Sequence, residues 1–559
     1  MSFIGIEIAD LPNLEGKMGA FAKLETKGRW GFLSNQDVKT THCLGYDIHY
    51  VGQMILPTDP QNVFDALSQA KGTFAYYFVQ ESMVNVGTDP MGFYPLYYTD
   101  NAHLPLAFST SITHLKRRFR SLTPNWDAWN LLFNDGHLLG KMTTIKEFSR
   151  LREGEVLVFP LHPSGKSNPE IQRFSFYHTP GPVSDKDFVM RGNALLSDTM
   201  EALMRDEQNV VIPLSAGHDS RRLAATAKHL DIPFSSITQS VRNPLNYDVD
   251  TLVAKQLADM LSLPEERYRH LPMPNRRDSI TQMLEKDYWT GFETPSHEWS
   301  MNIVHATPSS SLVCDGIVGD QIVTSSLYYN APEKMDALLQ NNGAYVDHLI
   351  KENSPLPLKR EAQERRRALI TSTLNEYACD QHAIVRYTVF NRTRRSTAAW
   401  YYPFLSKGSR VCLPYADVAF FHHGLTMPLD KKKDRLWQKI CLEAINPDIA
   451  GLHSTRDRLP AEYWRNQGAS YVPSKKLPFT QKQVEVPTKV FRCLERSLKE
   501  RIMDTVGLHL MPNVALKHQA WRYLPLQRCA LFLDWLKEDE TALPVLSNEM
   551  PAFVKERAR

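Results

Sequence analysis

The stretch VVIPLSAGHDSRRLAATAKHL, residues 210–230, decides the fold of this chain. Residues 210–214 form an apolar run, which predicts a buried parallel strand. A loop rich in small residues follows at 215–220, and residues 221–230 carry alanine and leucine on one face, which predicts a helix. This order of strand, tight loop and helix start favours phosphate binding, because backbone N–H groups and the positive end of the helix dipole point at the anion.

The side chains of the loop indicate which anion it binds. Ser215 and Ser220 add hydroxyl donors. Asp219 is a carboxylate, which repels polyphosphate unless a cation lies between them, so the loop predicts a nucleotide with Mg²⁺. No GK[ST] follows, so this is not a Walker A loop. We expect the nucleotide to contact Ser215, Ala216, Gly217, His218, Asp219 and Ser220. The alternative is an ordinary turn between a strand and a helix.

The loop resembles the pyrophosphate-binding SGGxDS loop of the ATP-dependent ligases related to asparagine synthetase and β-lactam synthetase, with Ala216 in place of the first glycine. The resemblance implies ATP and Mg²⁺ as cofactors. It also implies an α/β and α+β fold. An N-terminal αββα domain of the N-terminal-nucleophile glutaminase type would precede a doubly wound α/β ATP-pyrophosphatase domain with a helical C-terminal part.

Length and composition are typical of a globular protein of two or three domains. The chain has 559 residues, 42% hydrophobic and 23% charged, with a net charge of +3. This charge gives no reason to expect nucleic acid as a partner, and no apolar run reaches the roughly 18 residues of a membrane span. The N-terminus lacks the features of a signal peptide, and seven cysteines without a CxxC pair suit reduced thiols, so we expect a cytoplasmic protein.

The pattern along the chain predicts three regions: a β-rich domain at 1–165, a linker at 166–183 and an α/β domain at 184–559. The resemblance implies that the last of these is the ATP-dependent ligase domain. The strands expected in the first region lie at 3–8, 73–79, 84–87, 96–99 and 155–159. The region at 184–559 begins with a helix at 185–208 capped by Ser184. Strands and helices then alternate at 234–240, 247–261 and 311–314. From about residue 333 the pattern is mostly helical.

The first domain resembles the glutaminase domain of the same family. Residues 72–98 carry its G-x-F-A and D-P-x-G-x-x-P-L-Y-Y segments, residues 106–115 resemble its next strand, and residues 148–159 resemble its closing hairpin. In active members the nucleophile is an N-terminal cysteine, but this chain has Ser2, so we expect an inactive domain. Asp89 is expected either to hold the amine of glutamine or to cap the turn at Pro90.

Two further segments resemble the remainder of the ATP site. Ile237 and Thr238 lie on the strand that packs near adenine in the family, and Gly316, Gly319 and Asp320 match its G-x-G-x-D-E loop. Asp219 and Asp320 would then supply two hard oxygen ligands to Mg²⁺, with water and phosphate oxygens completing the octahedron. Alternatively, Asp320 caps the next helix.

Arg456 and Arg458 occupy the place of the family's lysine-bearing loop, which stabilises charge on the leaving pyrophosphate. Arginine can bind phosphate bidentately, and Lys475 or Lys476 is an alternative cation. The two arginines could equally be surface charges.

A general base is also expected, because an amine nucleophile must lose a proton. The position that carries tyrosine or glutamate in the family is Ile317, which cannot accept one. Glu293 and His297 are alternative bases, although both residues also suit a helix start at the surface.

These resemblances predict a glutamine-independent, ATP-dependent ligase that joins a carboxylate substrate to an amine through an acyl-adenylate. The substrates are small molecules or a peptide, and lactam and macrolactam cyclases of natural-product biosynthesis, including lasso-peptide cyclases, belong to this class. One alternative is amidation of a sugar or small-metabolite carboxylate with ammonia, and another is a non-catalytic binding relative. The expected assembly is a homodimer or a complex with a protein that delivers a peptide; no nucleic acid or membrane is expected.

Overall fold

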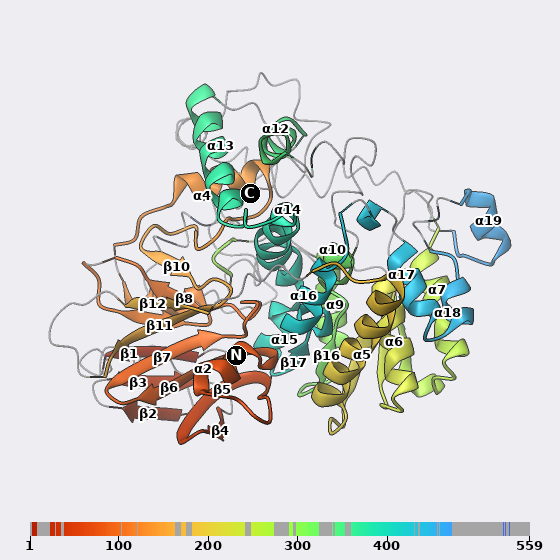
Figure 1. The fold of residues 1–559 in the computed structure, drawn as a ribbon, viewed down its shortest axis with the longest axis horizontal. Helices are drawn as coiled ribbons and strands as arrows, with labels where there is room; N and C mark the ends of the chain where they lie inside the picture. Colours follow the sequence, from red (N-terminus) through yellow and green to blue (C-terminus); the bar gives the residue numbers. More distant parts are fainter. Residues whose placement is uncertain are drawn as a thin grey trace, which may run out of the picture.

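The computed structural model describes residues 3–7, 23–27, 30–34, 38–101, 103–119, 121–161, 169–174, 181–240, 247–272, 290–293, 298–323, 338, 341–352, 359–429, 431–433, 436–454, 457, 459–471, 529, 532 and 536. Its architecture is mixed α/β. Antiparallel sheets form the first part and a parallel sheet forms the second, and the two parts lie side by side (Figure 1).

Two six-stranded antiparallel sheets build the first part. The first sheet runs in the order β10 (Phe148–Arg150), β8 (Tyr97–Thr99), β9 (Ala107–Ser109), β1 (Phe3–Glu7), β3 (Trp30–Ser34) and β2 (Lys23–Lys27). The second runs β12 (Glu170–Arg173), β11 (Glu155–Pro160), β7 (Met83–Thr88), β6 (Lys71–Gln80), β5 (Tyr46–Ile55) and β4 (Lys39–Cys43). The helices of this part are α2 (Val63–Ser68), α3 (Ile112–Arg118) and α4 (Trp126–Asn134).

Alternation along β6 explains how the two sheets pack. Tyr77 stacks on Phe32 of the other sheet with ring centroids 4.0 Å apart. Phe74, Tyr76 and Phe78 lie instead in a second buried cluster with the apolar residues of α2. Successive side chains of a strand point to opposite faces, so one strand supports both layers.

All five strands expected in the first part are present, with ends within two residues of the predicted ones. The predicted hairpin at 148–159 is wrong. β10 pairs with β8 in one sheet, whereas β11 pairs with β7 and β12 in the other. The intervening residues therefore connect two sheets. β12 lies within the stretch 166–183 and extends the second sheet.

A five-stranded parallel sheet organises the second part. Its order is β15 (Tyr268–Leu271), β14 (Ser235–Gln239), β13 (Val210–Pro213), β16 (Leu312–Cys314) and β17 (Arg410–Cys412). From β13 the chain adds β14 and β15 on one side, and it then adds β16 and β17 on the other side of β13. The order therefore reverses between β13 and β16, which makes this the topological switch point of the sheet.

The helices before and after these strands agree with the sequence pattern. Ser184 caps α5 (Asp185–Met204), its side chain accepting a hydrogen bond from the Asp187 N–H. The others of this region are α6 (His218–His229), α7 (Val249–Met260), η2 (Glu265–Arg267), α9 (Glu298–Ala306) and α10 (Gly319–Val323). α6 begins three residues before the predicted start at Arg221, so part of the predicted loop is its first turn.

The remainder of the second part is mostly helical, as expected. It comprises α12 (Asn342–Glu352), α13 (Arg360–Asn375), α14 (Ala383–Tyr387), η5 (Thr388–Thr393), η6 (Thr397–Tyr401), α15 (Tyr402–Lys407), η7 (Pro414–Ala416), α16 (Val418–Leu425), η8 (Lys431–Lys433), α17 (Leu436–Glu443), α18 (Pro447–Gly451) and α19 (Ala461–Asn466). Every helix in the described part of the chain is too short or too polar to cross a lipid bilayer.

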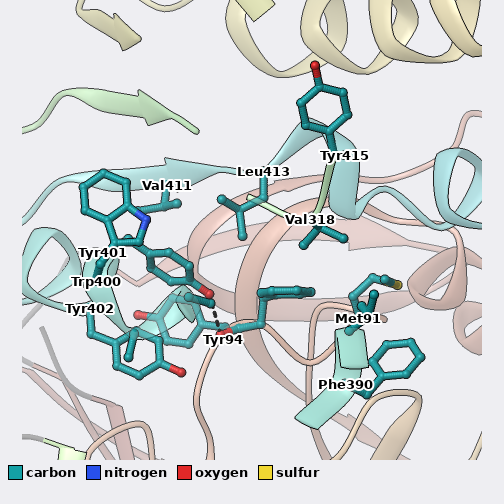
Figure 2. Close-up of a cluster of buried hydrophobic side chains, with 14 of the residues drawn as sticks. Met91, Tyr94, Val318, Phe390, Trp400, Tyr401, Tyr402, Val411, Leu413 and Tyr415 are labelled. Atoms are coloured by element: carbon teal, nitrogen blue, oxygen red, sulfur yellow. Dashed lines mark hydrogen bonds between the residues drawn. The ribbon is translucent and has the colours of Figure 1, made fainter. Parts of the chain in front are cut away.

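A shared buried core joins the two parts. Met91 and Tyr94 of the first part lie in one cluster with Phe390, Trp400 and Tyr401 of the second (Figure 2). The Tyr401 hydroxyl donates to the Phe93 carbonyl at 2.9 Å. The parts are therefore joined by buried contacts as well as by the chain between them.

Candidate functional site

The loop at residues 215–220 lies at the carboxyl end of β13, beside the switch point of the sheet. Gly217 is the N-cap residue of α6 and offers no side-chain acceptor to its first turn. His218, Asp219 and Ser220 are the first three residues of this helix. The start of a twelve-residue helix without a side-chain cap suits an anion, because its N–H groups and dipole both favour negative charge.

Hydrogen bonds within the protein hold the loop in shape. The Ser220 hydroxyl accepts from the Ser215 N–H at 3.2 Å, and the two serine hydroxyls lie 3.1 Å apart. The Gly217 N–H donates to Ser215 Oγ at 3.1 Å. The serines, expected as donors to phosphate, thus first shape the loop itself.

Ala216 is fixed on three sides. Its N–H donates to Asp250 Oδ1 at 2.7 Å, its carbonyl accepts from Arg221 Nη2 at 2.8 Å, and its methyl group is buried against Val249 and Trp464. Burial raises the pKa of Asp250, and the bond from Ala216 opposes that rise. The methyl group thus has a packing role that a glycine could not fill.

Asp219 faces the second predicted loop, which follows β16. A Cβ atom on Gly316 would lie 2.9 Å from Asp219 Cβ, and one on Gly319 would lie 2.8 Å from Asp219 Oδ1. Both glycines are therefore required by this close approach. The structure brings the carboxylate of Asp219 against the segment that carries Asp320, the second residue of α10.

The second loop is strained and internally braced. Val318 has φ +80°, a left-handed conformation that a β-branched residue rarely adopts. Asp315 braces the turn by accepting from the Ile317 N–H at 2.8 Å, and burial raises the pKa of its carboxyl to about 6. Backbone strain of this kind concentrates at functional sites, where the surrounding structure holds it in place.

Asp219 is held by Gln438 and Tyr415, two residues that the sequence did not indicate. Gln438 Nε2 donates to Asp219 Oδ1 at 2.7 Å, and Arg222 Nη1 donates to Gln438 Oε1 at 2.9 Å. Arg222 is in turn held by Asn193 Oδ1 at 2.7 Å. The Tyr415 hydroxyl, labelled in Figure 2, donates to the Asp219 carbonyl at 3.1 Å. Gln438 follows Asp219 by 219 positions, so no local pattern could reveal this relay.

Lys432 anchors the helix that carries Asp320. Its ammonium group donates to the carbonyl groups of Ile322 and Gly424 and is fully buried. Burial lowers the pKa of Lys432 to about 7, with Arg386 contributing to the decrease. This lysine joins the end of α10 to the end of α16.

The carboxylates of Asp219 and Asp320 could supply hard oxygen ligands to Mg²⁺ bound together with polyphosphate. No group of three His, Cys, Asp or Glu side chains placed to hold a metal occurs among the described residues. A site with two carboxylates fits Mg²⁺, which retains water and phosphate oxygens in its octahedron.

Arg221 connects the phosphate loop with the segment in which catalytic arginines were expected. Besides Ala216, its guanidinium donates to the carbonyl groups of Leu452 and His453 at 2.5 and 2.6 Å. Arg456, Arg458, Lys475 and Lys476 lie outside the described residues. The structure therefore shows the start of their segment beside the loop but does not describe the predicted cations.

Ile237 and Thr238 lie on β14, next to the strand that leads into the loop. The Thr238 hydroxyl donates to the Leu214 carbonyl at 3.1 Å, and the Ile237 carbonyl accepts from the Leu214 N–H at 3.1 Å. Both side chains are buried. Thr238 thus fastens β14 to β13 with the hydroxyl group that was expected to be close to adenine.

Glu293 corrects one expectation about the general base. It is buried, 1% exposed, rather than on the surface, and pairs with Arg395 at 3.1 Å. Burial raises its pKa, and Arg395 and Arg150 oppose that rise. The Tyr97 hydroxyl donates to the same carboxylate. Glu293 therefore belongs to the contact between the two parts, and His297 lies outside the described residues.

Asp89 caps the turn at Pro90, one of the two expected roles. Its carboxylate accepts from the N–H groups of Phe93 and Tyr94 at 3.0 and 2.7 Å. It is 3% exposed, and burial raises its pKa to about 6. Ser2 lies outside the described residues.

Comparisons with known proteins give little further information. No family model matches the chain, and no curated protein matches it. Two solved structures share 10% identity with it at a TM-score of 0.21. One is described as the allosteric regulatory enzyme of purine biosynthesis, with 49% of this chain and 81% of that chain covered. The other is glutamine phosphoribosylpyrophosphate amidotransferase from B. subtilis complexed with ADP and GMP, with coverages of 57% and 82%. At this TM-score the similarities support no conclusion about fold or activity.

Proposed function

We propose that this chain is an ATP-dependent carbon–nitrogen ligase that forms an amide bond through an acyl-adenylate. The observation that carries the proposal is the strand order of the parallel sheet, which sets the loops after β13 and β16 on either side of the switch point. Ligands of open α/β sheets bind at this position. The packing of Asp219 against Gly316 and Gly319 supports the same assignment.

Each part of the site has a role in the proposed reaction. A carboxylate oxygen of the substrate bonds to the α-phosphorus of ATP, and the bond to pyrophosphate breaks. An amine then bonds to the acyl carbon, AMP leaves, and the amine loses its proton. The first turn of α6 would hold the pyrophosphate, and Asp219 and Asp320 would hold a magnesium ion. Mg²⁺ would neutralise the charge of the leaving group. Arg456 and Arg458 are the proposed cations completing the phosphate site.

The first part is proposed to be a structural domain, so that the ligase does not use glutamine. Asp89, the residue that would hold the amine of glutamine, is engaged by two backbone N–H groups. A Cβ atom on Gly92 would lie 2.6 Å from Arg394 Nη1, so an arginine of the second part closes over this turn. The amine is then ammonia, a second substrate or the amine of the acid itself, and the last case gives a lactam or macrolactam.

The internal hydrogen bonds of the loop favour a second candidate function, that of a non-catalytic relative that retains the fold for binding. The N–H groups of Ser215, Ala216 and Gly217 all have acceptors within the protein. A phosphate group would have to bind at the first turn of α6 or displace these bonds. Nucleotide binding and turnover distinguish the two candidates.

The test measures binding of a non-hydrolysable Mg-ATP analogue by calorimetry. Wild-type protein should bind it only with Mg²⁺, and Asp219→Ala should lose binding while unfolding at a similar temperature. Asp259→Ala is the matched control, since Asp259 is an exposed residue of α7 paired with Lys255. Release of pyrophosphate with candidate carboxylates then tests turnover. Binding without any turnover would favour the non-catalytic relative, and retained binding by Asp219→Ala would contradict the metal assignment.

A further inference from the structure

A buried amide group without a partner lies at the end of β14. Gln239 is 4% exposed, and among the described residues neither its Nε2 nor its Oε1 atom has a hydrogen-bond partner. The next residue differs, since the Ser240 hydroxyl lies 2.8 Å from His270 Nε2. Buried polar groups are nearly always hydrogen-bonded, because desolvation without a partner is costly. The amide of Gln239 can therefore donate one hydrogen bond and accept another from a ligand or a water molecule.

Strand register places this residue beside the phosphate loop. Pro213 of β13 pairs with Ile237 of β14, and Leu214 is hydrogen-bonded to both Ile237 and Thr238. The next step along the two strands brings Gln239 level with Ser215, the first loop residue. Gln239 thus lies at the carboxyl edge of the sheet, on the side of the loop away from β16.

The two sides of the loop differ in chemistry. On the β16 side, Asp219 and the segment of Asp320 provide carboxylates for a cation that accompanies phosphate. On the β14 side, the Thr238 hydroxyl is already bonded to the Leu214 carbonyl, so it is engaged within the sheet. If the phosphates lie at the start of α6 and the cation lies toward β16, the β14 side is left for the uncharged part of the nucleotide.

We propose that the side chain of Gln239 binds the amino-bearing edge of adenine. A carboxamide presents one donor and one acceptor side by side, and adenine presents the complementary pair, its 6-amino group and an adjacent ring nitrogen. Glutamine recognises adenine in this bidentate way in other settings. This inference rests on the proposed function, because it assigns the base of the same nucleotide.

The experiment uses three probes with wild-type protein and two variants. The probes are Mg-ATP as a non-hydrolysable analogue, the same analogue lacking the 6-amino group, and inorganic pyrophosphate with Mg²⁺. Gln239→Leu removes both polar atoms at similar size. Ser236→Ala is the matched control, since Ser236 is another buried residue of β14 whose hydroxyl group has no partner in the part of the chain that the structure describes. Calorimetry gives each affinity, and thermal unfolding without nucleotide gives stability.

Wild type should bind the amino-bearing analogue about tenfold more tightly than the one without the amino group. Gln239→Leu should bind the two alike, with unchanged affinity for pyrophosphate and an unfolding temperature no lower than that of wild type. The unfolding temperature distinguishes a residue that contacts the ligand from one that only stabilises the fold, because replacing an unsatisfied buried amide relieves an energetic cost.

Two results would overturn the inference in different ways. In the first, wild type and Gln239→Leu both bind the ATP analogue and show the same preference for the 6-amino group. This result would show that the amide binds only a buried water molecule. Wild type that binds neither nucleotide nor pyrophosphate would instead refute the proposed function, and the assignment of Gln239 with it.

Discussion

At the scale of single residues, the orientation of Asp219 depends on a neutral side chain. Gln438 donates to Asp219 Oδ1 and is itself held by Arg222. Partners that orient a metal ligand typically contribute 10- to 100-fold in metal affinity. We therefore expect Gln438→Leu to raise the Mg²⁺ concentration needed for nucleotide binding by about tenfold. A Mg²⁺ titration at fixed nucleotide, followed by calorimetry, measures the change.

The control for this variant is Gln363→Leu, the same change at an exposed position of α13. It should leave the Mg²⁺ requirement as in wild type. Equal Mg²⁺ requirements in Gln438→Leu and wild type would mean that Asp219 is oriented by its other contacts, or that it does not bind the metal.

At the scale of elements, the two loops at the switch point fit together through glycine. A methyl group at Gly316 would lie 2.9 Å from Asp219 Cβ, so the loops must separate to accept it. We expect Gly316→Ala to weaken binding of the Mg-ATP analogue and to reduce the free energy of unfolding by about 1–3 kcal/mol, as overpacking does elsewhere. Calorimetry and urea denaturation measure these two effects.

Gly181→Ala is the control, since a methyl group there meets nothing within 4 Å. It should change neither quantity. Unaltered nucleotide binding in Gly316→Ala would show that the close contact between the loops is not needed for the site.

The sequence predicts those elements whose evidence is local. The strand and helix around the phosphate loop follow from an apolar run and an amphipathic segment, and the cap of α5 follows from Ser184. The hairpin expected at 148–159 failed because each of its strands pairs with a strand distant in sequence. The candidate site shows the same dependence on contacts distant in sequence. The loop sequence identifies Asp219, but Gln438 contacts it only because α17 packs on α6.

At the scale of the whole molecule, buried charges join the two parts. Arg395 of the second part donates to the carbonyl groups of Gly140 and Met142 of the first part, and it pairs with Glu293. Both charged side chains are at most 1% exposed. Removing one partner of such a pair leaves the other charge buried alone, which typically costs about 3–5 kcal/mol.

We therefore expect Arg395→Met to lower the free energy of unfolding by about that amount, and Arg395→Met with Glu293→Gln to recover part of the loss. The pKa of Glu293 is already raised by burial, and loss of Arg395 raises it further. A folded-state pKa above the unfolded one means that stability is retained at low pH and lost as pH rises through the folded-state value. The defect of Arg395→Met should consequently be larger at pH 8 than at pH 5.5, whereas the double variant, with no carboxylate to titrate there, should show no such trend. Urea denaturation at both pH values measures this difference. An equal defect at both would mean that Glu293 does not change its protonation state between these pH values in Arg395→Met, and that the loss comes from the bonds of Arg395 to the carbonyl groups.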